Sequence, residues 1–255
     1  MRVVITGAGG SIGRCLMAGL RAAGHDCVGV DVNVEPDDID IVDVDIFGDP
    51  DAFGAVVDGA DAVVHLAAIA DETSFSEAMH THLVLTHLAL EAAVAGGAGR
   101  FVYASSNHAV GWTPRTRMVA EATRIRPDTF YGVGKAACEA LCSLYHDRHG
   151  IEVACLRIGS FRERPTSRRE LSTWLSHGDM VRLVEACLTT PVLGFATMFG
   201  ISANTRRWWS LDAAEAIGYR PVDDAEAFAA EIEASPEAPT DAHDDAFVGG
   251  PMTRR

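Results

Sequence analysis

The sequence predicts an α/β fold: a Rossmann-type, doubly wound parallel sheet with a small additional C-terminal portion. Short apolar segments alternate with longer helix-like segments through residue 158, and strands separated in this way pair in parallel beneath helices on both faces. A glycine-rich turn joins the first apolar segment directly to the first helix. The 255 residues, 48% of them hydrophobic, are enough for one large domain with its own core.

Each element follows from a local pattern. Apolar runs predict strands at residues 2–6, 27–31, 39–44, 62–66, 100–104, 152–158 and 194–199. Helical patterns predict helices at residues 11–23, 51–57, 75–95, 129–149, 211–217 and 224–234, the third of which ends at Gly96-Gly97. Residues 171–188 are predicted to be largely helical. We expect residues 1–234 to form a single domain. Residues 235–255 are acidic and contain proline, and they predict a tail that folds over the surface or stays mobile.

Charge and composition exclude several classes of partner. The formal net charge is −15, which disfavours nucleic acids and anionic membranes. No apolar run approaches the ~18–20 residues that span a bilayer, and residues 2–6 lead straight into a glycine turn, so we expect no secretory leader. We therefore expect a cytoplasmic protein. Its six cysteines are then expected to be mostly buried thiols.

The N-terminal turn predicts a dinucleotide-binding site. The segment reads Thr6-Gly7-Ala8-Gly9-Gly10-Ser11-Ile12-Gly13. Glycines at positions 7, 10 and 13 allow the tight turn, the close approach of a pyrophosphate and the packing of helix on strand. The first helix then offers the N–H groups of its first turn to the phosphates. The candidate cofactor-binding residues here are Gly7, Gly10, Ser11, Ile12 and Gly13.

Acidic residues after the second and third strands indicate which dinucleotide binds. Asp31 ends the second predicted strand, 18 residues after the last of these glycines, where a carboxylate hydrogen-bonds the adenosine ribose. Val32 and Asn33 follow it, so no adjacent basic residue is available for a 2′-phosphate and NAD is favoured over NADP. Asp45 and Ile46, after the third strand, are placed to meet the adenine.

A tyrosine and the only lysine of the chain stand four positions apart. Tyr131 and Lys135 place a phenol and an ammonium on one face of a predicted helix. An ammonium close to a phenol favours phenolate, so we expect the pKa of Tyr131 to be lowered from about 10 towards the working pH. Tyr131 would then act as a general base towards an alcohol. Ser106 follows a predicted strand at the end where open sheets bind ligands, and its hydroxyl is a candidate to hold the reacting oxygen.

These motifs resemble those of the extended short-chain dehydrogenase/reductases, and within them the chain is most similar to uronate dehydrogenases. The superfamily motifs are the TGxxGxxG turn, a serine before a loop, and YxxxK. The more specific stretches are Ser105-Ser106-Asn107-His108, Arg157-Ile158-Gly159-Ser160, Glu170-Leu-Ser-Thr-Trp-Leu-Ser-His177, Pro191-Val-Leu-Gly194, and Ser202-Ala-Asn204 before Trp208-Trp209. The similarity covers residues 1–235.

The resemblance implies a catalytic triad and further cofactor contacts. Ser106, Tyr131 and Lys135 would form the triad, and Lys135 would also hold the cofactor ribose. The stretch Leu66, Ala67 and Ala68 would line the NAD site. Similar family members tend to have two glycines at the positions of the two alanines, so the cofactor cleft of this chain should be slightly narrower.

The resemblance also implies a substrate and a reaction. Asn107 and His108 would bind sugar hydroxyls, Ser160 would face the substrate, and Arg169 would bind a C6 carboxylate, for which a planar guanidinium is suited. These contacts would come mainly from residues 160–210. The implied reaction is NAD-dependent oxidation of a hexuronic acid, galacturonate or glucuronate, at C1 to the aldarolactone. Members of the superfamily commonly form helix-mediated dimers, so we expect a homo-oligomer.

Two departures leave alternatives open. His82 stands where the superfamily usually has a helix asparagine, so the proton relay behind Lys135 is in question. His82 and its neighbours His80 and His87 lack an acid or cysteine in register, so we expect no metal. The loop at residues 162–169 holds four arginines, more than one carboxylate needs. An aldose or sugar-phosphate 1-dehydrogenase therefore remains an alternative, as do a nucleotide-sugar epimerase or dehydratase and a non-catalytic NAD-sensing regulator.

Overall fold

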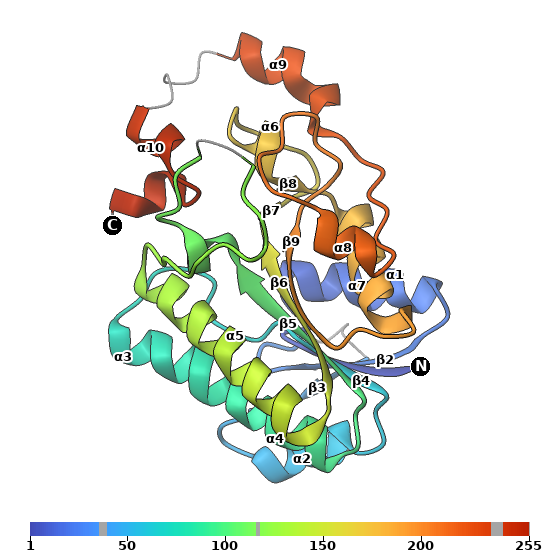
Figure 1. The fold of residues 1–255 in the computed structure, drawn as a ribbon. Helices are drawn as coiled ribbons and strands as arrows, with labels where there is room; N and C mark the ends of the chain where they lie inside the picture. Colours follow the sequence, from blue (N-terminus) through green and yellow to red (C-terminus); the bar gives the residue numbers. More distant parts are fainter. Residues whose placement is uncertain (36–39, 116–117, 236–241, 255) are drawn as a thin grey trace.

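The computed structural model describes residues 1–35, 40–115, 118–235 and 242–254, and it contains the predicted parallel sheet (Figure 1). The strand order is β3-β2-β1-β4-β5-β6-β9, and every pairing is parallel. The strands are β1 Arg2–Thr6, β2 Asp26–Asp31, β3 Ile41–Asp43, β4 Ala62–His65, β5 Arg100–Ser106, β6 Glu152–Ile158 and β9 Phe195–Gly200. The order reverses beside β1, which is the place where open α/β sheets bind ligands.

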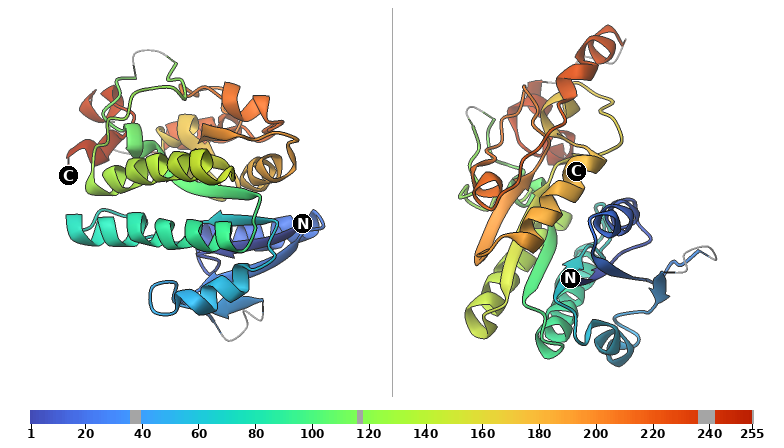
Figure 2. Two further views of the ribbon diagram at one scale, coloured as in Figure 1. Left: turned by 60° about the horizontal axis from the view of Figure 1, so that its bottom comes forward. Right: turned by 90° about the vertical axis from the view of Figure 1, so that its right-hand side faces the viewer.

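Helices cover both faces of the sheet, as the doubly wound prediction requires (Figures 1 and 2). One face carries α1 Ser11–Ala22 and α7 His177–Thr189, which pack against each other. The other face carries α2 Pro50–Val57, α4 Leu85–Ala95 and α5 Phe130–His149, and Figure 2 shows α4 and α5 side by side. Alternate residues of β1 point into the two half-cores: Val3 and Ile5 into one, Val4 into the other.

The helix predicted for residues 75–95 contains a π-helical turn. It runs through α3 Phe75–Ala78, the π-helical turn η1 Met79–Val84 and then α4. His82, within η1, is buried and packs against α5, where a Cβ on Gly134 would lie 2.8 Å from the His82 ring. Single π-helical turns are rare and often accompany functional sites.

Residues 171–188 are largely helical, as predicted, but the helical segment is interrupted. The structure has α6 Glu170–Thr173, then β8 Trp174–Leu175 paired with β7 Ser160–Phe161, and then α7. The side-chain amide of Asn204 donates to the carbonyl oxygen of Trp174 at 2.8 Å. In a continuous helix this oxygen would instead accept a hydrogen bond from a backbone N–H. Ser176 caps the new helix by accepting a hydrogen bond from the N–H of Asp179 at 2.9 Å. These side chains divide the helical segment in two.

The remaining chain surrounds the carboxyl end of the sheet. The short elements are the 3₁₀ helix η2 Asn107–Val110, α8 Asp212–Ala216, η3 Ala225–Phe228, α9 Ala229–Ala234, α10 Ala242–Ala246 and η4 Gly250–Arg254. We call residues 242–254 the C-terminal segment. Its backbone pairs with the stretch after η2, because Val248 N–H donates to the Thr113 carbonyl at 2.9 Å and Gly249 N–H donates to the Gly111 carbonyl at 2.8 Å. The described part of the predicted tail thus folds over the surface beside the site.

Two further expectations can be compared with the structure. The cysteines are free thiols, and all but the half-buried Cys15 are buried, which confirms the prediction. Within the described parts of the chain, none of the helices has the length and apolar character needed to cross a membrane.

Candidate active site

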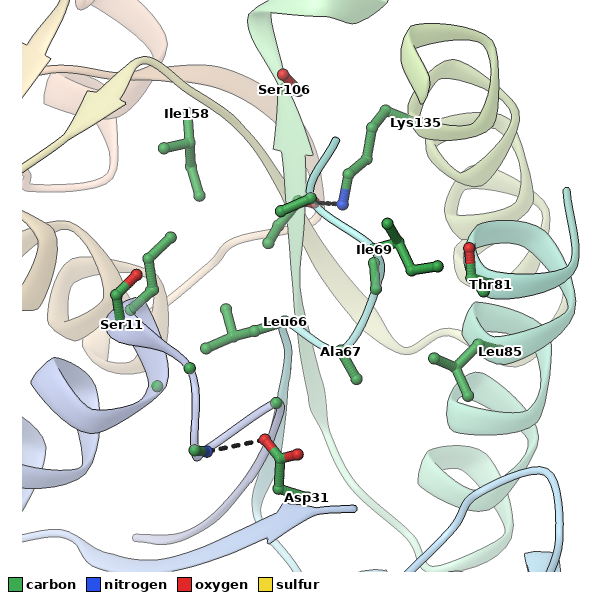
Figure 3. Close-up of a pocket in the computed structure, with 18 of the residues that line it drawn as sticks. Ser11, Asp31, Leu66, Ala67, Ile69, Thr81, Leu85, Ser106, Lys135 and Ile158 are labelled. Carbon is green, nitrogen blue, oxygen red and sulfur yellow. Dashed lines mark hydrogen bonds between the residues drawn. The ribbon is translucent and has the colours of Figure 1, made fainter. Parts of the chain in front are cut away.

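A cavity of about 970 Å³ lies at the carboxyl ends of the central strands (Figure 3). It extends from the glycine-rich turn after β1 to the end of β5 and the start of α5. The predicted site residues that line it are Gly7, Gly10, Ser11, Ile12, Gly13, Asp31, Asp45, Ile46, Leu66, Ala67, Ala68, Ser106, Asn107, His108, Tyr131 and Lys135. Ser160 and Arg169 do not line it. The fold therefore brings the predicted cofactor residues and the predicted triad into one cavity.

The turn after β1 is shaped for close approach of a ligand to the backbone. Gly7 has φ +71°, and a Cβ there would lie 2.8 Å from the backbone nitrogen of Ala67. A Cβ on Gly13 would lie 2.3 Å from the carbonyl oxygen of Gly7, so only glycine fits. Gly10, the N-cap of α1, places no side chain over the first-turn N–H groups. These groups and the helix dipole suit a pyrophosphate.

Asp31 is fixed at the end of β2 by three backbone N–H groups. Its Oδ2 accepts from Gly9 at 2.8 Å, a bond drawn in Figure 3, and its Oδ1 accepts from Val32 at 2.8 Å and Asn33 at 3.0 Å. The carboxylate is thus held beside the glycine turn. A carboxylate in this position accepts hydrogen bonds from free ribose hydroxyls and repels a 2′-phosphate. The residues present therefore fit NAD.

The triad side chains come from β5 and α5. Ser106 ends β5, Tyr131 lies in the first turn of α5, and both residues line the cavity. Glu72 holds the start of this helix, because its carboxylate accepts from the N–H of Phe130 at 3.0 Å and of Tyr131 at 2.9 Å. Lys135 Nζ donates to the Ala104 carbonyl at 2.7 Å and lies 5.5 Å from the centroid of the Tyr131 ring.

The prediction that the pKa of Tyr131 is lowered is wrong for the protein without NAD and substrate. Burial raises the pKa of Tyr131, and the charges of Asp128 and Asp71 raise it further, against a smaller lowering by the neighbouring Ser106 hydroxyl. Burial also lowers the pKa of Lys135 to about 8. The sequence shows that the two groups share a helix face, but it does not show how strongly removal from water disfavours both charged forms.

A buried aspartate accompanies His108. Asp128 Oδ2 lies 2.8 Å from His108 Nδ1, and the imidazole stands nearly perpendicular to the Tyr131 ring with 5.9 Å between centroids. Asn107 Nδ2 donates to the Val248 carbonyl of the C-terminal segment at 3.5 Å. Sequence reasoning missed Asp128, although an acid three positions before Tyr131 was visible.

The two predicted substrate residues outside the cavity are engaged elsewhere. Ser160 Oγ lies 2.8 Å from Thr173 Oγ1. Arg169 Nη2 donates to the Val248 carbonyl, while its Nη1 is buried with no partner among the described residues. Burial, followed by the charge of Arg115, lowers the pKa of Arg169 to about 10. The C-terminal segment therefore covers the predicted carboxylate-binding group.

Several lining residues were not among the predicted site residues. They include Phe47, Thr81, Leu85, Phe161, Arg162 and Met252. The basic loop gave a signal for Arg162, which pairs with Glu170 at 2.8 Å. Met252 belongs to the C-terminal segment, and no sequence pattern indicated that this segment reaches the cavity.

Comparison with known proteins places the chain in a family. The model of the NAD dependent epimerase/dehydratase family matches residues 3–191. The chain belongs to this family. The family name specifies NAD, the cofactor that the Asp31 pattern predicts, and the Rossmann-type fold and the short-chain dehydrogenase/reductase resemblance are confirmed with it.

Individual relatives extend the similarity over nearly the whole chain. A uronate dehydrogenase of Pseudomonas syringae pv. tomato is 35% identical over 252 residues, covering 98% of this chain and 92% of the relative. The crystal structure of uronate dehydrogenase from Agrobacterium tumefaciens superposes with a TM-score of 0.92 at 36% identity, covering 100% of this chain and 97% of that chain. An NAD-dependent glucose-6-phosphate dehydrogenase of Haloferax volcanii is 32% identical over 259 residues, covering 92% of this chain and 98% of the relative.

Proposed function

We propose that this protein oxidises the C1 hydroxyl of a cyclic hexuronic acid with NAD⁺ and forms the aldarolactone and NADH. The observation that carries the proposal is that Ser106, Tyr131 and Lys135 lie at one end of a cavity whose other end is the dinucleotide turn. Uronate dehydrogenases that match this chain from end to end support the choice of substrate.

The reaction requires the C1–H and O–H bonds of the sugar to break. NAD⁺, when bound, supplies the hydride acceptor and a positively charged ring. Tyr131 takes the hydroxyl proton as general base, and Ser106 donates a hydrogen bond to the same oxygen. A carbonyl forms at C1, and because the ring stays closed the product is a lactone. Lys135 holds the cofactor ribose and keeps a positive charge near the phenol below about pH 8.

The substrate carboxylate would be bound by Arg169. The unpartnered Nη1 of Arg169 is a buried donor, and a carboxylate oxygen would satisfy it. In the structure the Val248 carbonyl accepts from the same guanidinium, so substrate entry would require the C-terminal segment to move aside or to share this group. Asn107 and His108 would bind hydroxyls of the sugar from the end of β5.

The test is NADH formation with galacturonate, glucuronate, glucose, arabinose and glucose 6-phosphate. We expect kcat/KM for the two uronates to exceed the other values by at least about 100-fold, because a buried arginine left unpaired is costly. Strong turnover of glucose 6-phosphate instead would contradict the substrate and leave the fold and triad standing.

Two tyrosine variants test the chemistry. Tyr131→Phe should bind NAD normally and lose at least roughly 1000-fold in kcat. The matched control is Tyr145→Phe on the same helix, because Tyr145 lies outside the cavity and bonds His87 and Glu91. Substantial activity in Tyr131→Phe would refute the general-base role.

A further inference from the structure

Asp128 is a fully buried carboxylate beside the reacting groups, and the triad chemistry leaves it without a role. Its side chain has no exposed surface. Its Oδ2 lies 2.8 Å from His108 Nδ1, and Thr129 Oγ1 lies 3.3 Å from its Oδ1. A buried carboxylate is retained only where hydrogen bonds compensate its removal from water, so the bond to His108 is its main compensation.

The backbone around Asp128 leaves room for this carboxylate and nothing larger. A Cβ on Gly111 would lie 2.1 Å from Asp128 Oδ2, and a Cβ on Gly249 would lie 1.7 Å from the same atom. A Cβ on Gly132 would lie 3.2 Å from Oδ1 and 2.4 Å from the carbonyl oxygen of His108. Glycines from three separate parts of the chain therefore enclose one side chain. Gly249 comes from the C-terminal segment and closes the enclosure by donating to the Gly111 carbonyl.

This enclosure determines which nitrogen of His108 carries the proton. An ionised carboxylate only accepts hydrogen bonds, so Nδ1 must be the donor to Asp128. A neutral imidazole has one N–H, and Nε2 is then an acceptor. His108 lines the cavity, and its side chain is 15% exposed, so the ring is accessible to a ligand on the cavity side.

We propose that Asp128 is a positioning residue for substrate recognition: its carboxylate holds the Nδ1–H of His108, so that Nε2 accepts a hydrogen bond from one hydroxyl of the sugar. The proposal rests on the proposed function and states how the same site selects a hydroxylated substrate. Tyr131, packed against the His108 ring, would then meet a sugar whose orientation is fixed by this bond.

The kinetic test compares galacturonate with its 2-deoxy, 3-deoxy and 4-deoxy analogues in the wild-type protein and in Asp128→Ala. One analogue lacks the hydroxyl that His108 binds, and its kcat/KM in the wild-type protein should fall about 10- to 100-fold below that of galacturonate. In Asp128→Ala, galacturonate should lose a similar factor while that analogue changes less than about threefold, because its contact is already missing. The other two analogues should fall in parallel with galacturonate.

The matched control is Asp223→Ala. Asp223 also holds local structure, through Ser176 at 2.6 Å and Arg182 at 3.3 Å, but it lies outside the cavity lining. Asp223→Ala should lower thermal stability and leave the ratios of kcat/KM among the four sugars unchanged. If Asp128→Ala lowers kcat/KM for all four sugars by one factor, as a purely structural carboxylate would, the proposal is overturned.

A second measurement needs neither a stable Asp128 variant nor turnover. The ¹⁵N chemical shifts of the His108 ring, assigned by comparison with His108→Gln, report which nitrogen is protonated when the imidazole is neutral. We expect the Nδ1–H tautomer in the wild-type protein, and the Nε2–H tautomer would overturn the proposal. Because this readout is independent of activity, a protein that failed to oxidise hexuronates would refute the proposed function without deciding the state of His108.

Discussion

Lys135 Nζ donates a hydrogen bond to the carbonyl oxygen of Ala104 over 2.7 Å, and the lysine side chain is buried. The only lysine of the chain is therefore a buried cation whose partner is a neutral carbonyl. A single neutral acceptor offsets only part of the cost of removing an ammonium from water, and the pKa of Lys135 falls to about 8. This position serves the reaction at the expense of stability.

Lys135→Met should stabilise the protein while abolishing its activity. Below about pH 8 the folded protein carries the buried charge, whereas the unfolded chain keeps this proton up to about pH 10. Between these values the unfolded chain binds more protons, so the wild-type free energy of unfolding rises with pH. At about pH 7 the variant should be about 1–3 kcal/mol more stable, and the gap should close towards about pH 10. Denaturant unfolding without NAD measures the gap, and a gap that does not change with pH would contradict the assignment.

Gly13→Ala should remove NAD binding and destabilise the fold. The added Cβ would lie 2.3 Å from the carbonyl oxygen of Gly7 and 2.6 Å from the Cα of Ala8, and these backbone atoms cannot move without opening the turn. We expect a loss of about 1–3 kcal/mol in the free energy of unfolding. The matched control is Gly54→Ala in α2, where the new Cβ has no heavy atom within 4 Å beyond its chain neighbours and the backbone of its own helix, and a gain of up to ~1 kcal/mol is expected. Calorimetric titration with NAD and denaturant unfolding check both variants, and normal NAD affinity in Gly13→Ala would refute the turn as the pyrophosphate site.

Two buried histidines should make the protein sensitive to acid. Burial, aided by the charge of Lys135, lowers the pKa of His65 and of His82 to about 3. Below about pH 6.5 these histidines bind protons in the unfolded chain but stay neutral in the folded protein. The free energy of unfolding therefore falls with decreasing pH, by about 2 kcal/mol for each histidine between about pH 6.5 and 5. His82 Nδ1 is buried without a partner among the described residues, so His82→Leu leaves no hydrogen bond broken there. Over that pH interval the free energy of unfolding of this variant should fall by about 2 kcal/mol less than that of the wild-type protein, as measured by denaturant unfolding. A pH dependence equal to that of the wild-type protein would contradict the prediction.

The parts of the protein that could be predicted are those that depend on the spacing of residues close together in the sequence. The glycine turn, the acid at Asp31 and the Tyr131–Lys135 pair each lie within one element or at its end, so the periodicity of that element places them. The parallel sheet follows from the same alternation of strand and helix. The cavity therefore gathers every predicted cofactor and triad residue.

The features that could not be predicted depend on contacts distant in sequence. The break after Thr173 requires the amide of Asn204, and the enclosure of Asp128 requires Gly249, 121 positions further along the chain. The raised pKa of Tyr131 depends on burial, which no spacing of residues encodes. The C-terminal segment has no apolar periodicity, yet its backbone pairs with the residues after η2 and its Val248 carbonyl binds Arg169.

Two arginines, Arg162 and Arg169, are candidates to bind the substrate carboxylate. Arg162 lines the cavity, but it already pairs with Glu170, and 57% of its side chain is exposed. Arg169 has a buried donor without a partner in the described residues, although the C-terminal segment covers it. Water screens an exposed, paired guanidinium, whereas a buried one gains most from a carboxylate. Arg169→Met should therefore lower kcat/KM for galacturonate at least about 100-fold, mainly through KM, and change kcat/KM for glucose less than about threefold. Arg162→Met, the matched control, should change both values less than about threefold. Steady-state kinetics with the two sugars measure this contrast, and a selective loss of galacturonate turnover in Arg162→Met would move the carboxylate site to Arg162.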